Sequence, residues 1–95
     1  MSLRDEFKAE IKSAVGQCYD LGYAPTRFEQ MIENSHPVEV AKKFVVSSEF
    51  QSGFKELKKM GKLELTVEGI MVKTKFSSLF NSGELTAAQW RLENV

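Results

Sequence analysis

Residues 59–73, KMGKLELTVEGIMVK, fit two local structures that lead to different fold classes. Leu63, Leu65 and Val67 alternate with polar residues, as in a strand with one buried face. Thr66, however, stands where a helix N-cap would stand, directly before an apolar run with helical spacing. A strand would need a partner, and the chain contains no second alternating segment and no Asn-Gly or Asp-Gly hairpin turn. We therefore predict a junction between two helices, with Leu63 and Leu65 inserted into the core.

An amphipathic helix is predicted for residues 3–20. Its apolar side chains recur every three or four positions and form one stripe: Leu3, Phe7, Ile11, Ala14, Cys18 and Leu21. Ser2 and Asp5 suit the N-terminal cap, and Gly22 is a natural stop. The same spacing also fits a short coiled-coil seam, so the stripe can serve either internal packing or association with a partner.

Proline and histidine mark the next two helices. Pro25 and Pro37 suit a first helical turn, because an N–H at that position would have no intrahelical partner. His36 then lies at or near the cap of the helix that begins at Pro37. Three further helical segments follow: one capped by Ser52 after a connection at 47–51 and closed by Gly61, a short turn between Lys75 and Asn81, and a last helix from Ser82 or Gly83.

These segments predict an all-α fold without a sheet, as a compact orthogonal array of six to seven short helices. Residues 1–95 are expected to form one domain, in which the helix at 3–20 packs on residues 23–93. The chain contains no internal repeat and no linker long enough to divide it.

The charge balance and the single cysteine limit the possible functions. Thirteen basic and thirteen acidic side chains cancel, so no global field attracts nucleic acid or an anionic membrane. Cys18 alone can form neither an intrachain disulfide nor a multi-cysteine metal site. The apolar runs are too short to cross a bilayer, and no signal peptide is expected, so the predicted location is cytoplasmic.

Three blocks of the sequence, spread from about Tyr23 to Leu92, resemble a known family. They read APTRFEQMI, SGFKELKKMGKLELTVEGIMV and FSSLFNSGELTAAQWRL. They look like a family of small uncharacterised bacterial domains with Thr-Arg-Phe…Gln-Met, Ser-x-Gly-Phe-x-x-Leu and Gly-x-Leu-x-Leu-Thr-Val-Glu blocks. The resemblance implies a helical domain found alone or attached to longer proteins, some similar to nucleases or defence proteins. It carries over no catalytic residues, and the chain departs from the pattern at residues 35–37, where glycines are more usual.

The residues that could support catalysis do not form a recognisable motif. His36 is the only histidine, its position beside Pro37 is explained by capping, and no serine or cysteine accompanies it in a known pattern. Cys18 lies on the apolar stripe. Glu64 and Glu68 could be drawn as an acid and base pair, but a first helical turn already accounts for Glu68. We therefore expect no enzyme, no metal and no cofactor.

Lysines form the most suggestive polar feature. Lys55, Lys58, Lys59 and Lys62 are predicted to share one side of the fourth helix, with Lys42, Lys43, Lys73 and Lys75 in the same half of the chain. Residues 35–81 carry eight lysines and five glutamates, a local charge of 8 − 5 = +3, whereas residues 1–34 carry four basic and six acidic groups, 4 − 6 = −2. The lysine row is either a solvated helix flank or a contact for a phosphate backbone.

Tyr23, Arg27 and Trp90 are the candidates for a recognition surface, because aromatic residues and arginine dominate interface energetics. Arg27 could equally fix a carboxylate or a helix-end carbonyl. The sequence as a whole predicts a binding domain for another protein or for itself. The alternative is an accessory nucleic-acid-contacting domain of a bacterial nuclease or defence system that uses the lysine row.

Overall fold

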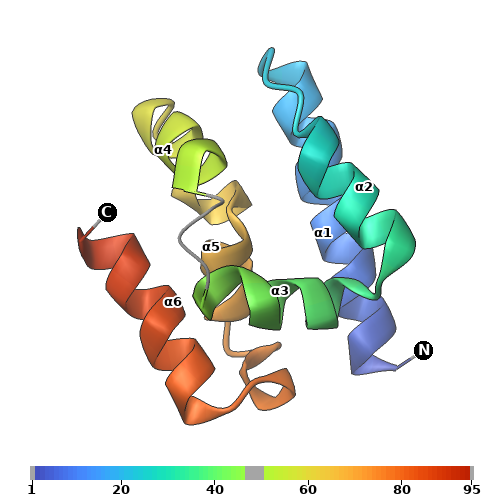
Figure 1. Ribbon diagram of the computed structural model, residues 1–95, viewed down its shortest axis with the longest axis vertical. Coiled ribbons are helices and arrows are strands. Elements are labelled where there is room, and N and C mark those ends of the chain that lie inside the picture. Colours follow the sequence, from blue (N-terminus) through green and yellow to red (C-terminus); the bar gives the residue numbers. More distant parts are fainter. Residues whose placement is uncertain (1, 47–50, 95) are drawn as a thin grey trace.

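The computed structural model describes residues 2–46 and 51–94. In these ranges it contains helices and two 3-10 turns and no strand, which confirms the all-α prediction. The elements are α1 (Leu3–Asp20), α2 (Thr26–Asn34), α3 (Pro37–Val46), α4 (Gln51–Lys59), η1 (Leu63–Leu65), α5 (Val67–Met71), η2 (Ser77–Leu79) and α6 (Ser82–Asn94). Figure 1 shows α3 running across the molecule between α1 and α6. Within the described ranges, no helix is both long and apolar enough to cross a membrane.

Helix α1 has the predicted bounds and the predicted caps. The Ser2 hydroxyl accepts a hydrogen bond from the Asp5 N–H at 3.2 Å. At the other end, Gly22 has a φ of 86°, which lets the Tyr23 N–H turn back to the Cys18 carbonyl at 2.9 Å. The inner stripe of α1 packs into the shared core, and its most buried members are Phe7, Ile11, Ala14 and Cys18.

The two prolines occupy different cap positions. Pro37 is the first residue of α3, as predicted, and the Val38 N–H donates to His36 Nδ1 at 3.2 Å, so His36 caps the helix. Pro25 instead stands at the N-cap of α2, one residue before the helix begins at Thr26. Its ring closes the turn after α1 and is buried.

Helix α4 begins one residue before the predicted cap. Ser52 therefore lies inside its first turn, and Gln51 belongs to the helix. The rest of the predicted connection, residues 47–50, lies outside the described residues. Gly61 closes α4 as expected: its φ of 72° allows the Lys62 N–H to reach the Leu57 carbonyl at 2.9 Å.

The ambiguous segment is a helix junction. Leu63–Leu65 form the 3-10 turn η1, and Thr66 caps α5 by accepting from the Gly69 N–H at 2.9 Å. The same hydroxyl donates to the Leu63 carbonyl at 2.6 Å, so it ties both turns together. A Cβ on Gly69 would lie 2.3 Å from that carbonyl oxygen, and only glycine allows this approach. Leu63 and Leu65 therefore belong to a 3-10 turn and not to a strand.

The core forms around α5, against which α1, α3 and α6 pack. Phe7 connects α1 to the residues that flank η2, because its ring meets Phe76 and Phe80 edge to face at centroid distances of 5.3 and 5.4 Å. Helix α6 begins with a reciprocal capping box. The Glu84 N–H donates to Asn81 Oδ1 at 2.8 Å, and the Asn81 N–H donates to Glu84 Oε1 at 2.9 Å.

Candidate functional site

A buried ion pair joins α5 to α6. Arg91 Nη1 donates to Glu68 Oε2 at 3.0 Å, and the two side chains are 9% and 1% exposed. The other carboxylate oxygen, Oε1, is buried and has no hydrogen-bond partner among the residues that the structure describes. A buried acceptor without a partner costs free energy, so the contact with Arg91 is the interaction that compensates the burial of this carboxylate.

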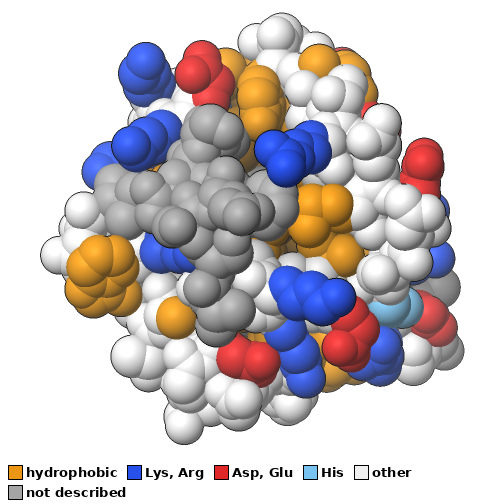
Figure 2. All heavy atoms as spheres, in the orientation of Figure 1, with side chains coloured by type: hydrophobic (Ala, Val, Ile, Leu, Met, Phe, Trp, Pro, Cys, Tyr) orange, Lys and Arg blue, Asp and Glu red, His pale blue; other side chains and the backbone are white. Residues whose placement is uncertain are grey.

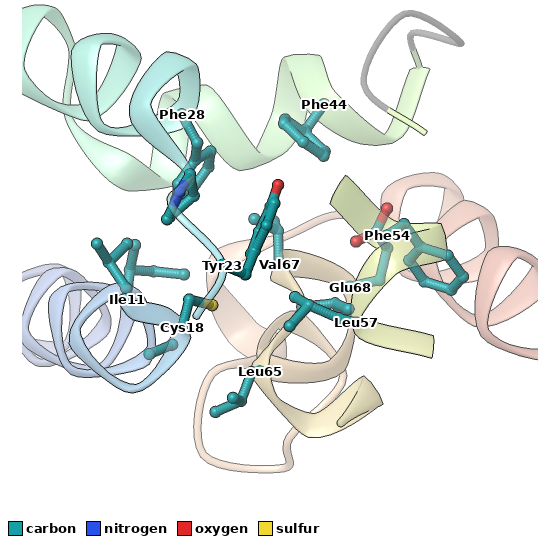
Figure 3. Close-up of a pocket in the computed structure, with 14 residues that line it drawn as sticks. Ile11, Cys18, Tyr23, Phe28, Phe44, Phe54, Leu57, Leu65, Val67 and Glu68 are labelled. Carbon is teal, nitrogen blue, oxygen red and sulfur yellow. The ribbon is translucent and has the colours of Figure 1, made fainter. Parts of the chain in front are cut away.

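Glu68 also lines a cavity of about 60 Å³ that we call the Glu68 pocket. The pocket is formed by side chains from α1, α2, α3, α4, η1 and α5, and its lining is predominantly apolar. Tyr23, Phe28 and Leu65 are its half-buried members, so the pocket meets solvent beside them. Figure 3 shows the Glu68 carboxylate and the Tyr23 hydroxyl both directed toward the Phe44 side of the pocket.

Cys18 and Tyr23 line the pocket with Glu68, and both have a pKa above the ordinary value for their type. Burial raises the pKa of the Cys18 thiol, which disfavours the reactive thiolate. Burial also raises the pKa of the Tyr23 phenol, and the nearby Cys18 and Glu56 groups raise it further. The pocket therefore offers an acceptor and a hydroxyl in an apolar lining, and no activated nucleophile.

The three predicted interface residues do not come together. Tyr23 lines the Glu68 pocket, whereas Arg27 and Trp90 are not among its lining residues. Arg27 is exposed on α2, and Trp90 is 58% exposed on α6. Helix α6 points the buried Arg91 inward and Trp90 outward.

The lysine row is only partly as predicted. Lys55, Lys58 and Lys59 are exposed on α4, but Lys62 lies beyond the helix end, after the turn at Gly61. Lys58 and Lys59 fall in the last turn of α4, where the helix dipole favours cations. Figure 2 shows several basic side chains on one face of the molecule.

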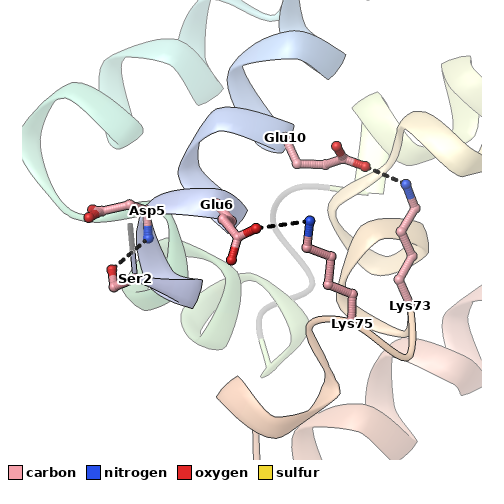
Figure 4. A network of polar contacts seen from close by, with 6 residues as sticks. All are labelled: Ser2, Asp5, Glu6, Glu10, Lys73 and Lys75. Carbon is pink, nitrogen blue, oxygen red and sulfur yellow. Dashed lines mark hydrogen bonds and ion pairs between the residues drawn. The ribbon is translucent and has the colours of Figure 1, made fainter.

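Two other lysines from the same half of the chain form ion pairs with glutamates of α1. Lys73 forms an ion pair with Glu10, and Lys75 Nζ lies 3.1 Å from Glu6 Oε1 (Figure 4). These pairs connect the part of the sequence with net positive charge to the part with net negative charge. They reduce the charge that the predicted basic surface could present to a phosphate backbone.

A second hollow, of about 600 Å³, lies between α1 and α2. Its walls carry both signs of charge, with Lys8 and Lys12 on α1 facing Glu29 and Glu33 on α2. The Tyr19 hydroxyl already donates to Glu29. This groove therefore favours no single class of ligand.

The histidine and the cysteine are also placed apart. His36 caps α3, with Arg4, Asp5, Lys8 and Glu39 as its charged neighbours, whereas Cys18 lines the Glu68 pocket. In the part of the chain that the structure describes, no group of three or more His, Cys, Asp or Glu side chains could hold a metal ion.

Sequence reasoning missed the pairing of Glu68 with Arg91. Glu68 was interpreted as a first-turn acid, and it does lie in the first turn of α5. Nothing in the sequence indicates its partner 23 residues away. The available signal was weaker: Arg91 falls three residues after Ala88, on the inner face of α6.

Comparisons of the chain with protein-family models, with curated proteins and with solved structures find no match. The resemblance drawn from the three sequence blocks therefore stays a prediction. Function has to be inferred from the residues of the chain itself and from their arrangement.

Proposed function

We propose that this chain is a non-enzymatic binding domain for a protein partner, and that it recognises the partner through the Glu68 pocket. The observation that carries the proposal is the predominantly apolar pocket of about 60 Å³, which Glu68 lines and which meets solvent beside Tyr23, Phe28 and Leu65. A concave apolar site with one well-placed polar group is the usual form of a binding site.

The size of the pocket favours a side chain over a metabolite. Pockets for drug-sized ligands occupy roughly 300–1,000 Å³, and a cavity of about 150 Å³ binds a molecule as small as benzene. The Glu68 pocket measures about 60 Å³. It suits a single short side chain that a partner protein or peptide inserts as an anchor.

Selection of peptides from a random library tests this proposal. Ala14→Val adds two methyl groups to the pocket lining, while Ala9→Val makes the same change at an exposed position of the same helix. We expect the selection to enrich peptides that bind the wild type and Ala9→Val but lose at least about tenfold in affinity for Ala14→Val. Peptides that bind all three proteins equally would contradict a role for the pocket.

Nucleic-acid binding by α4 is the second candidate, because Lys55, Lys58 and Lys59 are all exposed on one helix. If it is correct, DNA or RNA is retarded at low salt, and the affinity falls steeply as salt rises. Lys55→Glu combined with Lys59→Glu should abolish the shift, while Lys8→Glu combined with Lys12→Glu on α1 should preserve it. A wild-type protein that gives no shift at low salt removes this candidate.

A further inference from the structure

We infer that the hollow between α1 and α2 is a self-association surface, where a second copy of the chain packs so that α1 of each molecule lies against α2 of the other. The inference goes beyond the proposed function, because this hollow and the Glu68 pocket share only Val15 among their lining residues. It follows from three properties of the hollow: the partly uncovered apolar face of α2, the charge pattern of the walls and the open floor at Gly16.

Helix α2 is amphipathic, yet none of its nine residues is fully buried. Its apolar side chains, Phe28, Met31 and Ile32, are all half-buried, and Ile32 lines the hollow. Figure 1 shows α2 running back along α1, and the two helices are connected where the Tyr19 hydroxyl donates to Glu29. An amphipathic helix in a protein is stabilised mainly by packing of its apolar face. Helix α2 therefore leaves apolar surface beside the hollow that a second molecule can cover.

The charged side chains of the hollow form two rows of opposite sign. Lys8 and Lys12 lie one turn apart on α1, and Glu29 and Glu33 lie one turn apart on α2. Among the described residues, no ion pair joins the lysine row to the glutamate row. A ligand with charges of one sign would be repelled at one wall, whereas a surface that carries the same two rows in exchanged positions is complementary to both. A second copy presents that surface, and the formal net charge of zero at pH 7 means that no overall repulsion opposes the contact.

Two-fold symmetry determines how the two copies face each other. A two-fold axis that runs along the hollow places α1 of each copy opposite α2 of the other, so that each lysine row faces a glutamate row. An axis that runs across the hollow would place α1 against α1 and the two lysine rows against each other. Like charges facing each other across an interface oppose binding, so the charges select the first arrangement.

Gly16 leaves the floor of the hollow open. A glycine inside a helix is less favourable than alanine, and a Cβ at Gly16 would meet no atom within 4 Å, so packing within the chain does not require glycine here. Gly16 is exposed and lines the hollow. The missing side chain lets a second molecule approach the backbone of α1 closely.

Sedimentation velocity between about 1 μM and about 1 mM protein tests the inference. We expect the wild type to dimerise within this range, and Gly16→Gln, which fills the floor of the hollow with a good helix former, to weaken the dimer at least about tenfold. Ser13→Gln places the same side chain at an exposed position of α1 that does not line the hollow, so it should dimerise like the wild type. Ala14→Val, which changes the Glu68 pocket, should also dimerise like the wild type, so this test and the peptide selection can fail separately.

Exchange of the charged rows tests the arrangement of the two copies. Lys8→Glu with Lys12→Glu gives two acidic rows, and Glu29→Lys with Glu33→Lys gives two basic rows, so each double variant should dimerise at least about tenfold more weakly than the wild type. The quadruple variant has one row of each sign again and should recover the dimer. It should form no mixed dimer with isotope-labelled wild type in native mass spectrometry, because α1 of each would then face a row of its own sign.

A wild type that stays monomeric over the whole concentration range overturns the inference. A dimer that Gly16→Gln leaves unchanged uses another surface, which overturns it as well. A quadruple variant that keeps the native circular dichroism but stays monomeric, or that pairs with the wild type, contradicts the packing of α1 against α2. If a charge variant loses its helical signal, Gly16→Gln and Ser13→Gln decide the matter, because neither changes a charge and Gly16 has no atom within 4 Å of an added Cβ.

Discussion

Arg91 Nη1 lies 3.0 Å from Glu68 Oε2 and connects the last helix to the short central helix α5. The pair is almost completely buried, whereas the side chains of the pairs Arg4–Glu39, Lys73–Glu10 and Lys75–Glu6 are at least 37% exposed. The contact therefore has two roles. It balances a charge within the core, and it holds the Glu68 side chain at the wall of the pocket.

Removing one partner of this pair should be strongly destabilising. Arg91→Met leaves the Glu68 carboxylate buried without its counter-charge, and we expect the free energy of unfolding to fall by about 3–5 kcal/mol. The double variant Glu68→Leu with Arg91→Met should recover most of that loss, because it removes both charges. Chemical denaturation monitored by circular dichroism measures these changes.

Lys75→Met is the matched control for the buried pair. Lys75 is 59% exposed where it meets Glu6, so its loss should cost less than about 1 kcal/mol. Equal losses for Lys75→Met and Arg91→Met would show that burial does not set the strength of the Glu68 contact.

Gly69 and Gly16 should respond in opposite ways to alanine. Gly69→Ala places a Cβ 2.3 Å from the Leu63 carbonyl oxygen, so we expect a loss of about 2 kcal/mol or more. Gly16→Ala meets no atom within 4 Å and lies inside α1, so it should stabilise the protein by about 0.5–1 kcal/mol. Thermal and chemical unfolding of the two variants provide the comparison. A tolerated Gly69→Ala would mean that η1 and α5 do not approach as described.

The Thr66 hydroxyl should be needed for the junction between η1 and α5. Thr66→Val keeps the shape of the side chain but removes both of its hydrogen bonds, and we expect a loss of about 1–2 kcal/mol. Thr66→Ser retains the hydroxyl and should retain most of the stability. Slower amide exchange at Gly69 in the wild type and in Thr66→Ser than in Thr66→Val would confirm the cap. Equal protection in all three proteins would argue against it.

Stability should decrease as His36 is forced to take up a proton. Burial lowers the pKa of His36 below 6.5, Arg4 and Lys8 lower it further, and Asp5 and Glu39 act in the opposite direction. The unfolded chain therefore binds this proton more readily than the folded one. The free energy of unfolding should be highest above about pH 6.5 and should fall as the pH drops below it, down to the folded pKa.

His36→Asn isolates this contribution, because asparagine can still accept the Val38 N–H at the cap but does not titrate. Between about pH 7.5 and pH 5.5 the wild type should lose more stability than the variant, since carboxylates titrate in both. If the free energies of unfolding of the two proteins changed in parallel with pH, the lowered pKa of His36 would make no contribution to stability.

The sequence allowed the local features of the fold to be predicted, because their signals lie within a few residues. Ser2, Thr66 and Gly22 each act through hydrogen bonds to neighbours one turn away. The capping box of Asn81 and Glu84 acts over the same short range, directly around the predicted helix start at Ser82 or Gly83.

The candidate site could not be predicted in this way. The Glu68 pocket gathers side chains from six elements, and the pairing of Glu68 with Arg91 spans 23 residues. The lysines of the second half showed the same limit, since Lys73 is paired with Glu10, 63 residues earlier. Such contacts are set by tertiary packing, and helical periodicity and capping signals carry no information about it.

The most direct test of the central claim is a crystal structure of the protein with a selected peptide whose binding is weakened by Ala14→Val. If the Glu68 pocket is the recognition site, one short side chain of the peptide will occupy it, in contact with Ala14 and Val67. A peptide bound elsewhere on the surface, with no side chain in the pocket, would contradict the account.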